Sequence, residues 1–387
     1  MGDLKIRQLL RLSKSCIGKE EKAAVMKVLD KEFLGMGEEV GEFEGILSDY
    51  LERPAVCVAS GTAALQLALQ ATGIGPGDEV LVPTITYLAS FQAVSANGSV
   101  PVACDIDENT CLIDLNDAAK RITEKTKAIM PVHYAGQSVD FSSLMRLAQD
   151  HNLRIIEDAA HAFGSCYDGE RIGSFGDVTC FSFDGIKNIT CGEGGCVVSD
   201  DEELLNKIRN ARLLGVEGDS NKRFVNDRSW SFEVEQQGWR YHMSNLMAAI
   251  GIQQLAKFEE ASRKRVLLAR EYQRLLAAQV DLGIRPVLQN LDEVVPHIFP
   301  IRIRGMSNRN RVVIEMHTRG IQVGFHYQPN HLLRYFRKNG CPSLPVAERI
   351  FPELLTLPLH PDLDIDDCSY VVENLFAMIE QGIPFSS

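Results

Sequence analysis

The stretch Val178–Asp200 reads VTCFSFDGIKNITCGEGGCVVSD, and the rest of the chain is organised around it. Its first and last parts are apolar and β-branched, a composition typical of buried strands. Between them lies a polar turn with a single lysine, Lys187, and a glycine cluster at 192–195. Because an ammonium group is costly to bury, a lysine between two core strands should have a lowered pKa and a nucleophilic amine. The same residues would also suit a surface hairpin with a solvated lysine.

The segment 154–162, RIIEDAAHA, lies upstream and favours the first interpretation. It is a short apolar strand that ends in two acids, Glu157 and Asp158, and continues to His161. An aspartate at a strand end followed by a lysine strand fits pyridoxal phosphate chemistry. The carboxylate keeps the pyridine nitrogen protonated, and the lysine holds the aldehyde as a Schiff base. Adjacent strand residues point to opposite faces, so only one of the two acids can face the ring.

Three motifs together resemble a known family: EDAAH at 157–161, FSF-x3-K at 181–187 and GEGG at 192–195. They are similar to the signature of the DegT-type nucleotide-sugar aminotransferases, within fold-type I of the pyridoxal-phosphate enzymes. The resemblance extends, more loosely, over nearly the whole chain. It implies an α/β fold like that of aspartate aminotransferase. A large domain would have a mainly parallel, mixed sheet flanked by helices, and a small C-terminal α+β domain would follow.

The resemblance also implies roles for particular residues. Lys187 would bind pyridoxal 5'-phosphate covalently and be the catalytic residue, Asp158 would hold the ring nitrogen, and His161 would lie near the ring hydroxyl or ring edge. The cofactor phosphate would be bound by Gly61, Thr62, Ala63 and Ser182. Tyr87 would cover one cofactor face, although an aromatic at such a position is more often part of the core.

The phosphate site also has support from the residues themselves. A strand at 55–59 leads through Ser60 and the small residues Gly61 to Ala64 into a helical pattern. The free N–H groups and the dipole of a helix start favour an anion, and small side chains leave room for it. A plain helix N-cap would look the same.

The substrate would meet residues from three parts of the chain. By resemblance, the loop with Met36 and Gly37 borders the sugar-nucleotide entrance, although the glycines of this loop would also simply end a helix. Glu193, in the glycine cluster, and the pair His326 and Tyr327 complete the expected substrate contacts.

Composition limits the class of protein. The chain has 387 residues, a hydrophobic content of 45% and a net charge of −12, with no basic block for nucleic acid. No apolar run approaches the ~20 residues of a membrane span, and the first 20 residues lack the apolar core of a signal peptide. Ten scattered cysteines without a C-x-x-C pair indicate reduced thiols and neither a disulfide frame nor a metal site. We therefore expect a cytoplasmic protein with no membrane or nucleic-acid partner.

Strand and helix patterns alternate along the first half, which predicts a mainly parallel sheet with ligands at the carboxyl ends of its strands. The side chains expected at or just beyond these ends are Ser60, Tyr87, His133, Asp158 and Lys187. Residues 215–234 are expected to form an irregular surface loop, and residues 322–327 a strand. One long helix over 244–278 should contain the domain boundary. The cofactor domain would span 1–250, with an N-terminal helical segment, and the small domain 251–387.

The function expected from the resemblance is transfer of an amino group from glutamate to a keto sugar of a nucleotide-diphosphate sugar. The product would be an amino-deoxy sugar for a surface polysaccharide or another glycosylated product. A 4-keto-6-deoxy sugar is favoured, because the form of residues 192–195 and of 326–327 looks more like relatives that aminate C4 than C3. The nucleotide stays open between dTDP, UDP and GDP. Two alternatives are a sugar dehydratase, in which a histidine replaces the lysine, and a cofactor-binding regulatory protein without turnover.

Arg240 marks a departure from the family pattern. Relatives commonly have an asparagine at this point of the motif that runs from Gly238 to Tyr241, and it reaches across a dimer interface to the cofactor phosphate of the other subunit. The longer, charged Arg240 would bind either that phosphate or the substrate's diphosphate. It would otherwise be a plain surface arginine. The resemblance thus implies a homodimer with shared active sites.

Overall fold

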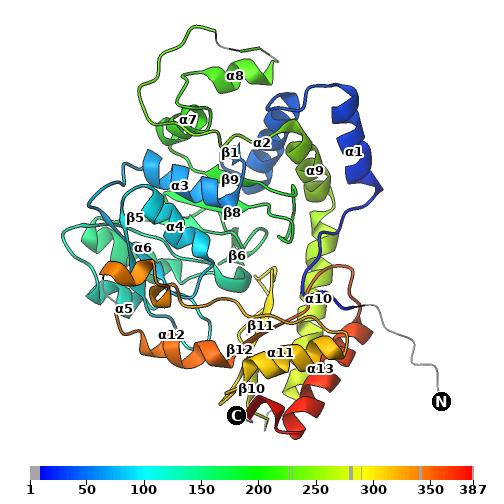
Figure 1. Ribbon diagram of the computed structural model, residues 1–387. Helices are drawn as coiled ribbons and strands as arrows, with labels where there is room; N and C mark the ends of the chain where they lie inside the picture. Colours follow the sequence, from blue (N-terminus) through cyan, green and yellow to red (C-terminus); the bar gives the residue numbers. More distant parts are fainter. Residues whose placement is uncertain are drawn as a thin grey trace.

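The computed structural model describes residues 9–225, 227–228, 230–278, 282–288, 290–339 and 342–385. At its centre is a seven-stranded sheet of order β1-β9-β8-β5-β4-β2-β3 (Figure 1). Its strands are β1 (Ala55–Val58), β2 (Glu79–Pro83), β3 (Val100–Cys104), β4 (Thr126–Ile129), β5 (Arg154–Asp158), β8 (Val178–Ser182) and β9 (Gly195–Val198). β9 alone runs antiparallel to its neighbours β1 and β8. The other six strands therefore end at one edge, and the expected mixed sheet is confirmed.

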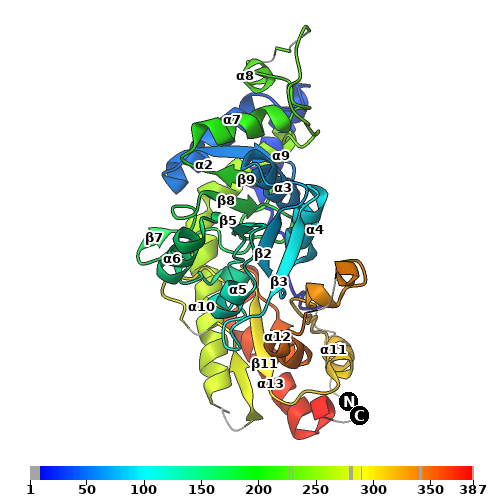
Figure 2. The ribbon, with the colours of Figure 1, turned by 90° about the vertical axis from the view of Figure 1, so that its left-hand side faces the viewer.

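Helices cover both faces of this sheet. Alternate strand residues belong to two different cores, with Val56 and Val58 in one and Ala55 and Cys57 in the other, as the two-residue period of a strand requires. The helices of the first face are α3 (Gly61–Ala71), α4 (Leu88–Ala96) and α7 (Glu202–Ala211). Those of the second face are α2 (Glu38–Leu51), α5 (Leu115–Lys120) and α6 (Phe141–His151). Figure 2 shows α3 and α4 on one side of the strands and α6 on the other.

The C-terminal part is built on a second, antiparallel sheet of order β10-β11-β12. Its strands are β10 (Ile284–Pro286), β11 (Phe299–Ile303) and β12 (Leu354–Leu357). Its helices are α10 (Phe258–Ala277), α11 (Arg309–Thr318), α12 (Pro345–Ile350) and α13 (Ile365–Glu380). The remaining elements are α1 (Lys19–Asp30), α8 (Asp219–Phe224), α9 (Asn245–Ala256), the short hairpin strands β6 (Cys166–Tyr167) and β7 (Glu170–Arg171), and 3-10 turns at Tyr134–Gly136, Asn330–Leu332, Phe336–Asn339, Phe351–Glu353 and Ile383–Phe385.

The expected single helix over 244–278 is wrong, because it is two helices, α9 and α10, that meet at Lys257. The break brings the Phe258 ring into the core against Phe163, at a ring distance of 5.2 Å. It lies so close to Gly164 that a Cβ there would be 2.3 Å from the ring. The helix is therefore interrupted at the point where the Phe258 ring packs into the core, instead of being continuous as the sequence pattern suggested.

Two other local predictions need correction. Residues 322–327 are not a strand: only Gly324 pairs with Thr356, after which the chain turns and the side chains of His326 and Tyr327 find partners of their own. The expected irregular loop at 215–234 contains the short helix α8.

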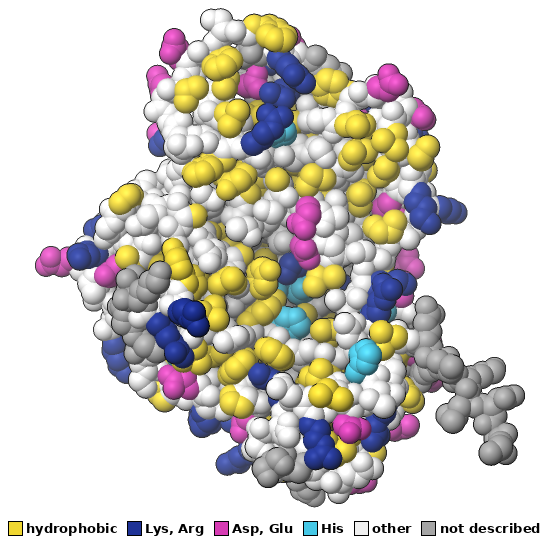
Figure 3. Space-filling model, in the orientation of Figure 1, with side chains coloured by type: hydrophobic (Ala, Val, Ile, Leu, Met, Phe, Trp, Pro, Cys, Tyr) yellow, Lys and Arg dark blue, Asp and Glu magenta, His cyan; other side chains and the backbone are white. Residues whose placement is uncertain are grey.

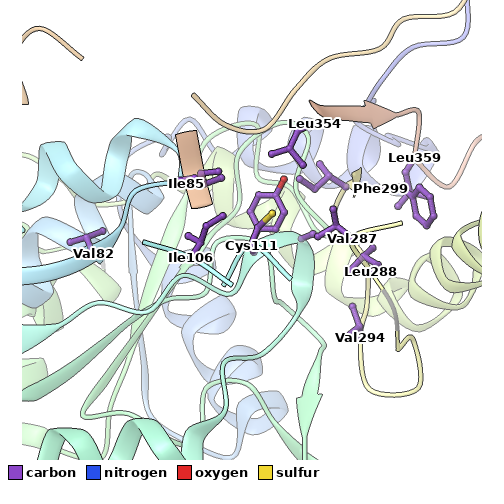
Figure 4. Close-up of a cluster of buried hydrophobic side chains, with 14 of the residues drawn as sticks. Val82, Ile85, Ile106, Cys111, Val287, Leu288, Val294, Phe299, Leu354 and Leu359 are labelled. Carbon is purple, nitrogen blue, oxygen red and sulfur yellow. The ribbon is translucent and has the colours of Figure 1, made fainter. Parts of the chain in front are cut away.

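The two parts share a continuous apolar core. It runs from Val82 and Ile106 of the large sheet region to Phe299 and Leu354 of the small sheet (Figure 4). Residues near the N-terminus also contact the C-terminal part, because Leu10 forms an isolated parallel bridge with Ile321. The division at residue 250 stays a prediction. Among the described residues, no helix combines the length and apolar character that a membrane crossing requires.

Candidate active site

A cavity of about 330 Å³ lies at the edge where the parallel strands end. Figure 3 shows histidine side chains gathered in the hollow at the centre of this face. The cavity contains most of the residues singled out from the sequence, although they come from distant parts of the chain. The predicted residues in its lining are Gly61, Thr62, Tyr87, Asp158, His161, Ser182, Lys187, Glu193, His326 and Tyr327.

Lys187 follows β8 in a tight turn, in which its backbone N–H donates to Asp184 O at 3.0 Å. Burial lowers the pKa of its amine to about 8, although the carboxylates of Asp184 and Asp158 act in the opposite direction. Near neutral pH a useful fraction of the amine is therefore unprotonated and nucleophilic. The Lys187 side chain is half-buried and lines the cavity, so it is not a fully solvated hairpin residue; its catalytic role stays a prediction.

The two adjacent acids on β5 have different surroundings. Asp158 lines the cavity, where Oδ2 accepts from Ser90 Oγ at 2.7 Å and Oδ1 from the Ala160 N–H at 3.1 Å. Glu157 points to the other face and is completely buried. Its oxygens there accept from the Gly176 N–H at 2.7 Å and Thr179 Oγ1 at 2.8 Å, and contact His133 Nε2 at 2.8 Å. Asp158 is therefore the acid that a cavity ligand meets, and His133 lies outside the cavity.

The start of α3 forms one end of the cavity. Ser60 is the N-cap, and its Oγ accepts from the Ala63 N–H at 3.1 Å, so that N–H is already used. The N–H groups of Gly61 and Thr62 lie in the first turn, where a helix offers them no internal partner. A Cβ on Gly61 would lie 2.7 Å from the Ser182 Cβ, so glycine is needed for β8 and α3 to approach. The result is a small pocket of N–H and hydroxyl donors, suited to a phosphate.

Aromatic rings and histidines form the opposite wall. His161 is buried, and its Nδ1 accepts from the Ala135 N–H at 3.3 Å while its Nε2 lies 2.9 Å from Tyr327 Oη. Burial and the nearby Lys187 hold the pKa of His161 well below its usual range, so the ring is neutral. Tyr87 is 60% exposed, with its ring 5.6 Å from that of Tyr327. An exposed aromatic beside the cavity is free to cover a flat ligand.

The remaining predicted lining residues are polar. His326 Nδ1 contacts Thr356 Oγ1 at 2.8 Å, and burial and Lys187 lower its pKa to about 4. The pKa of Glu193 is raised, first by partial desolvation and then by the Asp184 carboxylate. These groups give the open side of the cavity hydrogen-bonding capacity for a substrate.

Four predicted residues do not line the cavity. Met36 is fully buried in the core, and Gly37 caps α2 with the Phe33 ring packed where a side chain would be. Ala63 lies in the first turn of α3, and Arg240 is exposed, bridging Leu213 through its backbone. Their predicted contacts with cofactor or substrate stay predictions.

One close neighbour of the lysine was missed from the sequence. His297 Nε2 lies 3.4 Å from Lys187 Nζ. His297 precedes β11, 110 residues further along the chain, and belongs to none of the quoted motifs. Only the packing of the small sheet against the large one brings it here.

The residues present fit pyridoxal phosphate. The cavity offers a buried amine for the aldehyde, a carboxylate for the ring nitrogen, an exposed aromatic for one ring face, and the α3 turn for the phosphate. The closeness of Gly61 to Ser182 is the feature specific to such a phosphate pocket, because it brings a hydroxyl next to the free N–H groups.

Comparisons with known proteins agree with this fit. The model of the DegT/DnrJ/EryC1/StrS aminotransferase family matches residues 15–376. SpsC of Bacillus subtilis, a spore coat polysaccharide biosynthesis protein, is 36% identical over 377 residues, which are 95% of this chain and 97% of SpsC.

Solved structures are similar over nearly the full length. A putative sugar aminotransferase of Streptococcus pneumoniae in its PMP form has a TM-score of 0.89 and 31% identity, covering 96% of this chain and 98% of its own. PseC of Helicobacter pylori, an aminotransferase involved in the biosynthesis of pseudoaminic acid, has a TM-score of 0.89 and 28% identity, covering 97% and 100%. The chain therefore belongs to the DegT/DnrJ/EryC1/StrS aminotransferase family and is a sugar aminotransferase that uses pyridoxal phosphate.

Proposed function

We propose that this enzyme moves an amino group from glutamate to a 4-keto-6-deoxy sugar carried on a nucleoside diphosphate. The observation that carries the proposal is that Lys187 and Asp158 line one cavity, with the pKa of the lysine lowered to about 8. Lys187 argues against the dehydratase alternative, in which a histidine would take its place. The full lysine, aspartate and phosphate-turn set argues against a regulatory protein without turnover.

When bound, pyridoxal phosphate supplies an aldehyde that accepts the amino group and a ring that withdraws electrons. Lys187, once its amine is free, would carry the proton between the substrate carbon that bears the nitrogen and the carbon that was the cofactor's aldehyde. Asp158 holds a proton on the ring nitrogen. The α3 turn, with Gly61, Thr62 and Ser182, binds the phosphate. The same residues act in the opposite direction when the keto sugar enters.

We propose further that the active enzyme is a homodimer with shared sites. Support comes from residues 213–240, which we call the arm. Figure 1 shows it as an extension at the top of the molecule that includes α8. Its described residues expose apolar side chains, with Val225 75%, Trp230 87% and Phe232 55% accessible. Apolar surface of this kind is typical of a site that a second chain covers. Arg240 belongs to the same arm and would reach the neighbouring site.

The biological role proposed is synthesis of an amino-deoxy sugar for a surface polysaccharide or a glycosylated product, as the polysaccharide biosynthesis name of SpsC suggests. The cytoplasm is the proposed location. The nine cysteines in the described residues are all free thiols, which suits a reducing compartment.

The test has two stages. Adding glutamate to the purified enzyme should convert the absorbance of the pyridoxal form into that of the pyridoxamine form. Adding 4-keto-6-deoxy sugars on dTDP, UDP and GDP should then reverse the change, and mass spectrometry should detect the aminated sugar. The corresponding 3-keto sugars are the control that shows whether the enzyme aminates C4 or C3 of the sugar. Reversal by 3-keto but not 4-keto sugars would overturn the proposed substrate, and no response to any amino donor would overturn the reaction.

A further inference from the structure

Among the described residues, one side chain that does not line the cavity lies within hydrogen-bonding distance of the Lys187 amine. Nζ of Lys187 is 3.4 Å from Nε2 of His297, a residue 3% exposed in the segment before β11. We propose that His297 is a positioning residue for the catalytic lysine, and that its Nε2 exchanges a hydrogen bond with the Lys187 amine in both protonation states of that amine. This inference rests on the catalytic role proposed for Lys187.

The backbone of His297 is held by hydrogen bonds at its N–H and its carbonyl, and its ring packs against a second histidine ring. Its backbone N–H donates to Ala135 O at 3.3 Å, and its carbonyl accepts from Arg265 Nη1 at 3.2 Å. Its ring centroid is 4.5 Å from that of His161. Arg265 is itself buried and donates also to the carbonyls of Pro296 and Leu359, which ties α10 to this segment. The ring therefore stays behind Lys187 without having to find its place during catalysis.

The second nitrogen of His297 makes the exchange possible. An ammonium has three donors and no acceptor, so Nε2 must accept from protonated Lys187, with the ring proton on Nδ1. A neutral amine has a lone pair, so it can accept from an Nε2–H. Among the described residues, the buried Nδ1 of His297 has no hydrogen-bond partner. Neither tautomer is therefore fixed by a second bond, whereas both nitrogens of the neighbouring His161 have partners.

The charges around this pair keep His297 neutral while Lys187 titrates. Burial is the main cause that holds the pKa of His297 well below its usual value, and the nearby Lys187, His161, Arg265 and His326 lower it further. Lys187 faces the carboxylates of Asp184 and Asp158. His297 therefore acts on the lysine as a neutral hydrogen-bond acceptor and not as a base. The bond that the ammonium donates to Nε2 is charge-assisted and therefore stronger than the bond that the neutral amine accepts, so removing both should lower the pKa of Lys187 further.

Two variants separate this role from simple packing. In His297→Gln the side-chain amide can reach the position of Nε2 and can accept or donate there. In His297→Phe the ring volume is kept and the hydrogen bond is lost. His360→Phe is the matched control, because His360 is also buried, and neither of its nitrogens has a partner among the described residues.

The first measurement uses cofactor-free protein. Competitive acetylation of Lys187 is followed against pH by mass spectrometry of its peptide. We expect a midpoint at about 8 in the unchanged protein and in His297→Gln and His360→Phe. A fall of about one pH unit is expected in His297→Phe, because a hydrogen bond to a charged group is stronger than one to a neutral group by about that amount. An unchanged midpoint in His297→Phe, or the same fall in His297→Gln, would overturn the proposal.

The second measurement is activity of the enzyme with cofactor. In His297→Phe kcat should fall about 10- to 100-fold while KM changes less than about twofold, because the residue touches no substrate. His297→Gln should recover most of kcat. If His297→Phe does not fold, His297→Asn replaces it, since its shorter amide cannot reach Nζ. A loss confined to KM would contradict the positioning role. If borohydride fixes the cofactor to some other lysine, the catalytic assignment of Lys187 fails, while the acetylation data still report on the Lys187–His297 pair.

Discussion

The cavity and the arm differ in which groups they leave without a partner. Polar groups at the cavity are paired within the chain, whereas large apolar groups on the arm are left exposed. At the cavity, polar groups find partners within this chain: buried Asp158 accepts from Ser90 and Ala160, and half-buried Lys187 lies beside His297. On the arm, large apolar groups are exposed, and Trp230 is 87% accessible. Buried charge with partners indicates a site that one chain can assemble, because unpaired buried charge is costly. Exposed apolar surface on the arm is the observation that supports the proposed homodimer.

The largest effect is expected from Lys187→Ala. Turnover should fall by about 10⁴-fold or more, because the variant loses both the covalent attachment and the proton transfer. The fold should persist, since the alanine removes a buried amine without a carboxylate partner. Activity with glutamate and a keto sugar measures the loss, and circular dichroism checks the fold. Borohydride should attach the cofactor to the original protein but not to the variant. Residual turnover near the original level would mean that the cavity is not the catalytic site.

Replacing each of the two acids of β5 in turn by its amide tests whether the acid on the cavity face is the one required for activity. Asp158→Asn should lower kcat about 10²- to 10³-fold, the usual effect of removing one charged partner of the reacting system. The cofactor should still bind. Glu157→Gln is the matched control on the same strand, and its cost should appear as a loss of stability of about 1–3 kcal/mol, because the buried groups around it lose a carboxyl oxygen that accepts their hydrogen bonds.

Thermal unfolding and kcat measured on both variants check this pair. The reverse pattern, with Glu157→Gln inactive and Asp158→Asn mild, would show that the wrong carboxylate had been assigned to the cofactor.

Features of the fold and the site that depend on residues close together in the sequence could be predicted, and those that depend on contacts between distant residues could not. The Val178–Asp200 stretch and the acids of β5 were interpretable because strand pairing sets which residues meet at a sheet edge, and their order along the chain already carries that information. The helix start at Ser60 was predictable for the same local reason, since an N-cap and its turn lie within a few residues.

The features that sequence did not predict depend on distant packing. The break at Lys257 follows from the Phe258 ring meeting Gly164, and helical periodicity alone does not report such a contact. The turn of His326 and Tyr327 out of the sheet depends on side-chain partners at Thr356 and His161. His297 was missed because it approaches Lys187 only through the contact of the two sheets.

A smaller effect is expected from the arm, where Trp230→Ser tests whether a second chain covers it. A buried interface tryptophan commonly contributes about 2 kcal/mol or more, so the dimer should dissociate about 30-fold more readily. Sedimentation at several concentrations measures this. Met145→Ser, an exposed apolar residue on α6, is the control and should leave assembly unchanged. If the protein is a monomer before any substitution, the hypothesis that a second chain covers the arm is wrong.

The smallest effect expected is that of Arg240→Ala, which joins the two regions. Among the described residues its guanidinium makes no hydrogen bond or ion pair, although it sits on an arm with exposed apolar groups. If it binds the cofactor phosphate or the sugar-nucleotide diphosphate of the neighbouring subunit, the loss of this one exposed charged contact should weaken binding of that ligand about 10-fold. Separate titrations with cofactor and with sugar nucleotide identify which anion it meets.

Mixing variants tests whether Arg240 acts across the interface. In a hybrid of an Arg240→Ala subunit with a Lys187→Ala subunit, the site that contains the intact Lys187 receives the intact Arg240 from the other chain, while the second site lacks both. Random pairing makes half of the dimers hybrids, so about one quarter of the sites should be restored. If Arg240 instead served its own subunit, every site with Lys187 would still lack the arginine and mixing would add nothing. Recovery on mixing therefore distinguishes a shared site from a self-contained one. Full activity of Arg240→Ala alone would show that Arg240 contacts neither anion, and only the apolar residues of the arm would then support an interface.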